Sequence, residues 1–143
     1  MTDEACDPLR VTKDQSVING GPLLLANGRT HITQKQDGMN HAVVGNPSFD
    51  YGWVLQRNPR TFAGTDGRGR TVLVAAEGRQ PGHLGLSIPE TAAVARALGL
   101  REAINLDGGG STALVARGEL LTSPSDAAGE RPVGDAIVVL PRR

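Results

Sequence analysis

The sequence predicts an α+β domain in which a β-rich, twisted mixed sheet packs against one or two helices. Three observations lead to this fold class. Nineteen glycines and nine prolines among 143 residues are too many for a helical bundle, and no internal repeat accounts for them. Short apolar runs separated by turn dipeptides recur along the chain, as in strands joined by hairpins. Only one segment has a clear helical spacing of apolar residues.

Length and composition indicate one folding unit. A chain of 143 residues has the usual size of a single domain, and the sequence contains no visible domain boundary. Residues 1–15 are polar and aperiodic, so we expect a loosely held arm there and a single domain over residues 16–143. Hydrophobic residues make up 38% of the chain but aromatic residues only 3%, so the core must be mainly aliphatic.

Charge and cysteine content exclude several classes of protein. Fifteen basic and fifteen acidic residues cancel, and nucleic-acid binding is not expected because it needs a basic surface. The lone Cys6 excludes an internal disulfide and a cysteine-based zinc site. The first residues lack the basic and apolar segments of a secretion signal, and no apolar run is as long as a membrane span. We therefore expect a soluble chain and assign it no compartment.

The first half of the domain is predicted to contain three strands and a loop. Residues 16–32 read as two short strands turned at Asn27-Gly28, a strong hairpin dipeptide. Residues 33–47 are polar and rich in glycine and asparagine, so we expect a long loop. Four large side chains then alternate along a third strand and share one face: Phe49, Tyr51, Trp53 and Leu55. We favour a core-facing stripe over a platform that stacks a sugar ring, and both interpretations remain open.

The segment "LSIPETAAVARALGL" is the predicted helix. Ser87 is its expected N-cap and Pro89 lies in the first turn. Glu90 follows three residues after the cap, which is the spacing of a capping box. Gly99 is expected to end the helix.

Hairpins account for most of the remaining chain. "RTFAGTD" and "RTVLVAAEG" are predicted to pair across a turn at residues 66–69, with the apolar run Val72–Ala76 as a central strand. "EAINL" is a further strand, and "TALVARGELL" is a hairpin turned at Gly118. The run "VGDAIVVL" is predicted to be the strand that closes the domain.

The most unusual motif is "NLDGGGST", which directly follows a predicted strand. Glycines here let backbone N–H groups converge on an anion and let a bulky phosphate approach them. Asp107 is expected at the strand end, where side chains emerge into a cleft. The alternative is a flexible turn or a bulge, and the run matches neither the P-loop nor the dinucleotide fingerprint. From the glycines alone, both interpretations remain open.

Three further polar clusters follow or precede predicted strands: "RNPRT", "EGRQPG" and "SDAAGERP". Arginine is well shaped for bidentate contacts with phosphate, although a surface salt bridge is its ordinary role. Each cluster taken alone reads as structural. Their recurrence at strand ends indicates one assembled pocket.

Taken together and in this order, "NPRT", "EGRQPG…LSIPE", "INLDGGGST" and "SDAAGERPV" closely resemble the phosphodiester glycosidase family, over roughly residues 19–140. The resemblance implies hydrolysis of a sugar-1-phosphodiester. It also implies a set of site residues: Asn58, Arg60, Glu77, Arg79, Glu90, Asn105, Asp107, Ser111 and Arg131.

The resemblance suggests a role for most of these residues. Arg60 and the backbone of Gly108, Gly109, Gly110 and Ser111 are expected to hold the phosphate, with Arg79 or Arg131 assisting. Asp107 is expected to be the chief catalytic carboxylate and Glu77 the second, because glycosidic cleavage normally uses two. Asn58 and Asn105 are expected to orient sugar hydroxyls.

For Glu90, the residue spacing and the family resemblance suggest different roles. Its spacing from Ser87 explains it as part of a helix cap, and we favour that over catalysis, although the resemblance includes it among the catalytic residues. No cofactor is expected. A divalent cation at Asp107 is conceivable but has no support in the sequence, and the three scattered histidines are not spaced as metal ligands.

The chain departs from the family pattern in two places. Glu77 stands where the family commonly has Asp, and family domains usually carry further sheet-forming sequence before "INGGP". A homo-oligomer in which another subunit completes the sheet is one expectation that follows. A non-catalytic module that binds a sugar phosphate or glycan is the alternative function. Family members are often exported, and the sequence names neither the sugar nor the stereochemical outcome.

Overall fold

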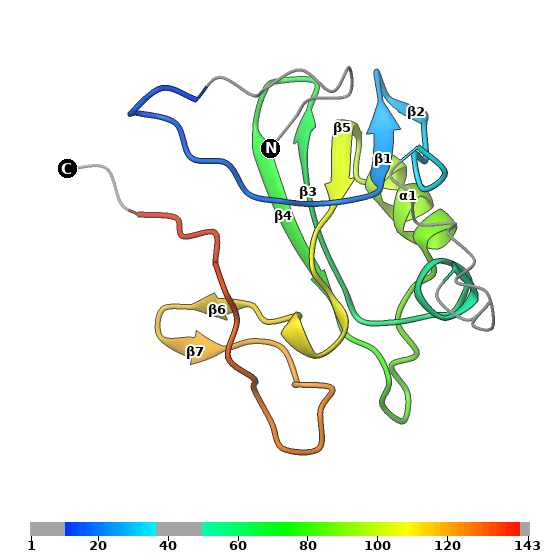
Figure 1. Ribbon diagram of the computed structural model, residues 1–143, viewed down its shortest axis with the longest axis vertical. Coiled ribbons are helices and arrows are strands. Elements are labelled where there is room, and N and C mark those ends of the chain that lie inside the picture. Colours follow the sequence, from blue (N-terminus) through cyan, green and yellow to red (C-terminus); the bar gives the residue numbers. More distant parts are fainter. Residues whose placement is uncertain (1–10, 37–49, 141–143) are drawn as a thin grey trace.

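The computed structural model describes residues 11–36 and 50–140 of the chain (Figure 1). Five strands form one sheet in the order β2-β1-β5-β3-β4. Their bounds are β1 Leu23–Ala26, β2 Arg29–Thr30, β3 Arg60–Asp66, β4 Thr71–Ala76 and β5 Leu100–Asn105. A separate hairpin consists of β6 (Val115–Ala116) and β7 (Glu119–Leu120). The α+β class is confirmed, and within the described ranges every pairing between named strands is antiparallel rather than mixed.

The predicted hairpins are confirmed. β1 and β2 turn at Asn27-Gly28, where both residues have positive φ, and β3 pairs with β4 from Arg60–Ala76 to Thr65–Thr71. Gly118, also with positive φ, lies between β6 and β7. β5 lies at the centre of the sheet, between β1 and β3. It ends at Asn105, and the glycine run follows directly at this end of the sheet.

The helix α1 (Ile88–Ala97) begins as the sequence predicts. The Ser87 side chain accepts from the Glu90 backbone N–H, the Glu90 carboxylate accepts from the Ser87 N–H, and the capping box is therefore complete. One face of α1 packs on β1 and β5 (Figure 1). The core between them is aliphatic, with a single aromatic residue among its fully buried members. These members are Leu24, Leu25, Val54, Phe62, Ile88, Ala92, Ala95, Leu100 and Ala103.

The aromatic stretch is not a strand. Residues Asp50–Leu55 form a short π-helix, in which Val54 is buried while Tyr51 and Leu55 are more than half exposed. The helical turn directs the backbone carbonyls of Gly52 and Trp53 toward the side chains of Asn58 and Arg60. A strand would have used those carbonyls in a sheet ladder, so the polar neighbours of this stretch override its alternating pattern. Phe49 lies outside the described residues.

One strand is misplaced and two predicted strands are absent. Val72–Ala76 lies in β4 as predicted, but at the edge of the sheet rather than its centre, and its side chains are only partly buried. Residues 16–20 are irregular. The run at 133–140 is also irregular: a cavity separates its first residues from β4, and Val138, Val139 and Leu140 are 70%, 81% and 78% exposed. For these last two segments, apolar content alone predicted strands that pair with no other strand in the described part of the chain.

Parts of the predicted N-terminal arm and of the long loop, residues 1–10 and 37–47, lie outside the described residues. Among the helices of the described ranges, none has the length and apolar character needed to cross a membrane.

Candidate functional site

The glycine run brings the other three motifs together. It follows β5 and enters a single 3-10 turn, Gly109–Ser111. All three glycines are buried. Each is covered by a different segment of the chain, and in each case a side chain on the glycine would collide with that segment or press against it.

Gly108 is covered by the "NPRT" segment. A Cβ at Gly108 would lie 2.7 Å from the Pro59 carbonyl oxygen, closer than non-bonded atoms allow. The Gly109 N–H donates to the same oxygen at 2.9 Å. The absence of a side chain at Gly108 therefore lets two main-chain segments pack directly on each other.

Gly109 and Gly110 are covered by arginines. The Arg79 guanidinium lies against Gly109, where a Cβ would be 3.3 Å from both of its terminal nitrogens. Gly110 faces the ion pair of Arg131 and Asp126, and a Cβ there would overlap both side chains. "EGRQPG" and "SDAAGERP" thus each contribute one arginine to the glycine run, as the assembled-pocket prediction requires.

The backbone donors of the run are mostly used inside the protein. Gly108 N–H donates to the Asp107 carboxylate at 2.9 Å, Ser111 N–H to the Gly108 carbonyl and Thr112 N–H to the Gly109 carbonyl. A phosphate held by the backbone N–H groups of the run, as the sequence predicts, would therefore find no free donor at Gly108, Gly109 or Ser111. Gly109 and Gly110 instead allow two arginines to pack closely, because a Cβ at either position would clash with or press on the guanidinium.

Arg60 is buried rather than presented to a ligand. Its side chain is 0% exposed and stacks on Trp53, with the guanidinium carbon 4.8 Å from the ring centroid. It donates to the backbone carbonyls of Leu86 at 2.8 Å, Gln56 at 3.3 Å and Trp53. Because the side chain is fully buried, a phosphate cannot contact Arg60 directly in this structure.

Arg60 and Arg79 form a local concentration of positive charge. Burial, and to a smaller extent the charge of Arg79, lowers the pKa of Arg60 from its ordinary value to about 10. Asn58 positions Arg79: its side-chain oxygen accepts from Arg79 Nε at 3.0 Å and Nη2 at 2.8 Å, while its amide donates to Gly52 and Gln56 carbonyls. Within residues 11–36 and 50–140 no carboxylate pairs with either arginine. An anion at this point would offset an otherwise unbalanced charge.

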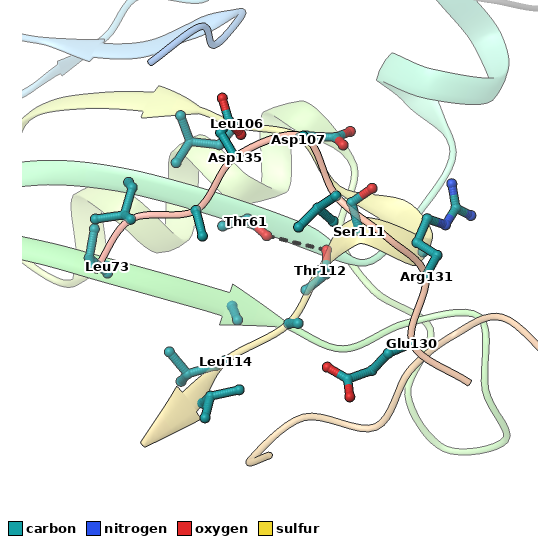
Figure 2. A pocket seen from close by; sticks show the side chains of 18 of the residues that line it. Thr61, Leu73, Leu106, Asp107, Ser111, Thr112, Leu114, Glu130, Arg131 and Asp135 are labelled. Carbon is teal, nitrogen blue, oxygen red and sulfur yellow. Dashed lines mark hydrogen bonds between the residues drawn. The ribbon is translucent and has the colours of Figure 1, made fainter. Parts of the chain in front are cut away.

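A cavity of about 390 Å³ opens beside the glycine run (Figure 2). Its wall includes side chains from β3 and β4, the glycine run, the hairpin strand β6 and the irregular segment after Arg131. Its polar members are Asn19, Thr61, Asp107, Ser111, Thr112, Glu130, Arg131 and Asp135. Thr61 and Thr112 join across it by a hydroxyl hydrogen bond of 3.3 Å, which ties the run to β3.

Three of the predicted site residues lie on this wall with their side chains: Asp107, Ser111 and Arg131. The Asp107 carboxylate is exposed, and among the described residues it accepts only from the adjacent Gly108 N–H. Ser111 lies one residue beyond the arginine-covered glycines. A carboxylate, a hydroxyl and a guanidinium thus meet at one end of the cavity (Figure 2).

Two predicted carboxylates are elsewhere. Glu77 accepts from the Ser123 N–H at 2.6 Å and lies 3.2 Å from His83 Nδ1, so it joins two loops. Glu90 caps α1 and receives two 3.0 Å bonds from Arg57 Nε. These bonds, first from Arg57 and then from the Ser87 N–H, lower the pKa of Glu90 to about 2. Neither carboxylate lines the cavity.

Asn105 is buried at the end of β5 and is also not on the cavity wall. Its amide nitrogen donates to the carbonyls of Gly21 and Leu106, both at 2.9 Å. Its side-chain oxygen is buried without a hydrogen-bond partner. The residue fixes the exit of the strand, and in this structure a sugar hydroxyl cannot reach it.

The sequence did not single out Asn19 and Asp135, which lie on the wall, and the cluster that contains Glu130 read as structural when taken alone. Asp135 was placed in a predicted strand, although an acidic residue within an apolar run was a signal that it faces a polar space. No group of three His, Cys, Asp or Glu side chains suited to a metal ion occurs in the described part of the chain.

Comparison with known proteins agrees with the motif pattern. The sequence model of the phosphodiester glycosidase family matches residues 3–140. N-acetylglucosamine-1-phosphodiester alpha-N-acetylglucosaminidase from Mus musculus is 34% identical over 124 residues, which are 87% of this chain and 23% of that protein. The Homo sapiens enzyme is 34% identical over 110 residues, 77% of this chain and 21% of that protein. The chain thus spans less than a quarter of the length of these relatives.

Solved structures show the same fold. A Burkholderia pseudomallei K96243 protein superposes with a TM-score of 0.71 at 44% identity, covering 80% of this chain and 23% of that one. The zebrafish N-acetylglucosamine-1-phosphodiester alpha-N-acetylglucosaminidase catalytic domain, auto-inhibited by pro-peptide, superposes with a TM-score of 0.63 at 28% identity, covering 82% of this chain and 37% of that one. Since the family match spans nearly the whole sequence and its motifs converge on one glycine run, the chain belongs to the phosphodiester glycosidase family.

Proposed function

We propose that this chain hydrolyses the glycosidic bond between a sugar and a phosphodiester. One observation carries the proposal: the "NPRT", "EGRQPG" and "SDAAGERP" motifs cover Gly108, Gly109 and Gly110 in turn, beside a cavity that Asp107 lines. Family membership and the names of the mouse and human relatives support a substrate with a sugar-1-phosphodiester, and N-acetylglucosamine is the first sugar to test.

Arg79 and Arg131 are the proposed phosphate ligands. Their guanidiniums lie against successive glycines of the run, Arg79 at Gly109 and Arg131 at Gly110, and Arg131 also lines the cavity while Arg79 does not. Arginine binds phosphate through paired N–H donors. Arg131 shares its Nε and one terminal nitrogen with Asp126, and Arg79 is held by Asn58, so both are oriented before substrate arrives. Arg60 adds charge from within without touching the ligand.

Asp107 is the proposed catalytic carboxylate. It is on the cavity wall and is bonded only to the adjacent backbone N–H. A carboxylate beside the anomeric carbon can accept a proton from the attacking water. The phosphate departs as an anion that the two arginines stabilise, so protonation of the leaving group contributes less than in ordinary glycosidases.

A non-catalytic module that binds a sugar phosphate is the second candidate. It is favoured by Glu77, the expected second carboxylate, which is engaged with Ser123 and His83 away from the cavity. A pocket without the expected second carboxylate could bind a sugar phosphate without hydrolysing it.

The test is release of free sugar from aryl phosphodiesters of N-acetylglucosamine and of other hexosamines. Asp107→Asn keeps the oxygen that accepts from Gly108 N–H and removes the charge. We expect it to abolish turnover and to leave affinity for the diester largely unchanged. Binding without release of sugar by the unmodified chain would favour the second candidate instead.

A further inference from the structure

The hydrolysis proposed at this cavity needs a second carboxylate, and no residue described so far fills that role. Glycosidic cleavage normally passes through a transition state with positive charge on the anomeric carbon and ring oxygen, and two carboxylates serve it. Glu77 and Glu90, which the sequence offered beside Asp107, both lie off the cavity wall and are bonded to protein partners. The second carboxylate must therefore come from another segment.

Only two further carboxylates line the cavity within the described residues, Glu130 and Asp135. In Figure 2 the Glu130 carboxylate lies in the lower part of the view, away from Asp107, whereas Asp135 lies in the upper part, as Asp107 does. Asp135 has no hydrogen bond or ion pair in the part of the chain that the structure describes. It is thus a carboxylate without a structural task, on the wall that also holds the proposed base.

We propose that Asp135 is the second catalytic carboxylate of this site, an inference that rests on the proposed function. The ionised side chain faces the sugar ring and stabilises the positive charge that develops there. Water attacks the anomeric carbon and forms the new carbon–oxygen bond, and Asp107 takes its proton. The bond to the phosphate oxygen breaks, and its electron pair leaves with the phosphate monoester. Asp107 then returns the proton to solvent.

The position of Asp135 in the chain suits this role. It follows Arg131 by four residues in an irregular segment, so one stretch contributes both a phosphate ligand and the second carboxylate. Residues 133–137 of this segment line the cavity together with Leu73 and Ala75 of β4, so the segment forms part of the wall that a bound sugar would contact.

Because Asp135 is proposed to act on charge that appears only in the transition state, its loss should change kcat and not substrate binding. Asp135→Asn is expected to lower kcat about 100-fold to 1,000-fold, the range found when one such electrostatic contact is removed. KM for an anionic diester should stay the same or fall, since one repelling charge is gone. Thermal unfolding should be unchanged, because the side chain has no partner among residues 11–36 and 50–140.

The experiment compares steady-state kinetics of the unmodified chain, Asp135→Asn, Glu130→Gln and Glu119→Gln, with an aryl phosphodiester of N-acetylglucosamine as substrate. Glu119 lies in β7 and not on the cavity wall, so its variant is the matched charge control and should behave as the unmodified chain. A kcat loss at Asp135 alone, with KM kept, supports the inference.

Two outcomes would overturn it and are distinguishable. If the unmodified chain hydrolyses the diester and Asp135→Asn does so equally well, or if Glu130→Gln shows the loss instead, the assignment to Asp135 is wrong while the proposed function stands. If the unmodified chain releases no sugar from any diester offered, the proposed function and the assignment fail together.

Discussion

The Arg79 guanidinium packs flat against the backbone of Gly109, close enough that any side chain at that position would press on both terminal nitrogens. Arg79 itself has a positive φ of 59°, a backbone conformation uncommon for residues other than glycine. Asn58 accepts two hydrogen bonds from it. Three separate motifs of the sequence thus cooperate to hold one cation at the glycine run, which explains why they occur together.

Adding a methyl group to the first or the third glycine should have different consequences. At Gly108 the new Cβ meets the main-chain oxygen of Pro59 at 2.7 Å, and β3 begins next to it, so the backbone must move. We expect Gly108→Ala to lower the free energy of unfolding by about 1–3 kcal/mol, as overpacking does. Urea unfolding measures this loss.

Gly110→Ala meets only the side-chain ends of Arg131 and Asp126, which can swing away. We expect a stability change within about 0.5 kcal/mol but a clear loss of diester hydrolysis, because Arg131 is displaced from its place. Gly52→Ala is the control, since no atom lies within 4 Å of its Cβ position. Equal losses of stability at Gly108 and Gly110 would contradict this account of the run.

We expect Arg60 and Arg79 to have different functions: Arg60 stabilises the fold, and Arg79 binds the ligand. Arg60→Met removes the hydrogen bonds from this buried guanidinium to the backbone carbonyls of Leu86 at 2.8 Å, Gln56 at 3.3 Å and Trp53. Asn58 still donates to the Leu86 and Gln56 carbonyls, but each hydrogen bond from a charged group contributes about 1.5–3 kcal/mol, so we expect the variant to be poorly folded. Circular dichroism and thermal unfolding test this.

Arg79→Gln should instead fold normally, because Arg79 is exposed. A charge-assisted hydrogen bond contributes about 1.5–3 kcal/mol, and we therefore expect KM for the diester to rise roughly tenfold to a hundredfold. Arg96→Gln, at the far end of α1, removes the same charge without a change in KM. A folded and fully active Arg60→Met would show that the buried guanidinium is dispensable.

The sequence predicted those parts of the fold that short-range chemistry determines. The capping box at Ser87 and Glu90, the turn at Asn27-Gly28 and the hairpin at Gly118 each depend on residues a few positions apart, and all are present. The stretch Asp50–Leu55 and the run at 133–140 could not be predicted from their own residues. Their structure depends on distant partners: Arg60 and Asn58 for the first, and a β4 edge across a cavity for the second.

For the site, the sequence predicted which motifs meet but not what each residue does there. Arginine next to glycine can mean a ligand between them or direct packing, and only the Cβ positions at Gly109 and Gly110 distinguish the two. Likewise, Glu77 and Asp135 look equally free in the sequence. In the structure the first bonds to Ser123 and the second to no described residue.

Glu90 should make stability depend on acid pH. Its pKa is about 2 in the folded chain against 4.5 as its ordinary value, mainly through hydrogen bonds from Arg57. A carboxylate with a lowered folded pKa stabilises the fold above pH 4.5, and this contribution disappears as the pH falls from 4.5 toward 2. We expect Glu90→Gln to be less stable than the unmodified chain at pH 7 and equally stable near pH 2.

Urea unfolding of both proteins across this range measures the difference. Asp66, whose pKa is also lowered, is present in both and cancels in the comparison. A difference that stays constant from pH 7 to pH 2 would mean that the charge of Glu90 adds nothing to the cap. A loss of kcat at pH 7 in a well-folded Glu90→Gln would restore the catalytic role that the family resemblance implied.

Glu77 is expected to position a loop rather than take part in the chemistry. It accepts from Ser123 N–H at 2.6 Å, and Gln80 donates to the Pro124 carbonyl at 2.8 Å from the same side. These bonds anchor the chain shortly before Asp126 and Arg131. Glu77→Ala should therefore speed amide hydrogen exchange at Ser123 and raise KM several-fold, while kcat stays within a few-fold, because the arginine is less well held but the cavity carboxylates remain. Gln80→Ala weakens the same anchor without removing a charge and should give the same pattern. If Glu77→Ala abolishes kcat and Gln80→Ala does not, the carboxylate itself is required for the reaction, and Glu77 has the second catalytic role that the sequence first suggested.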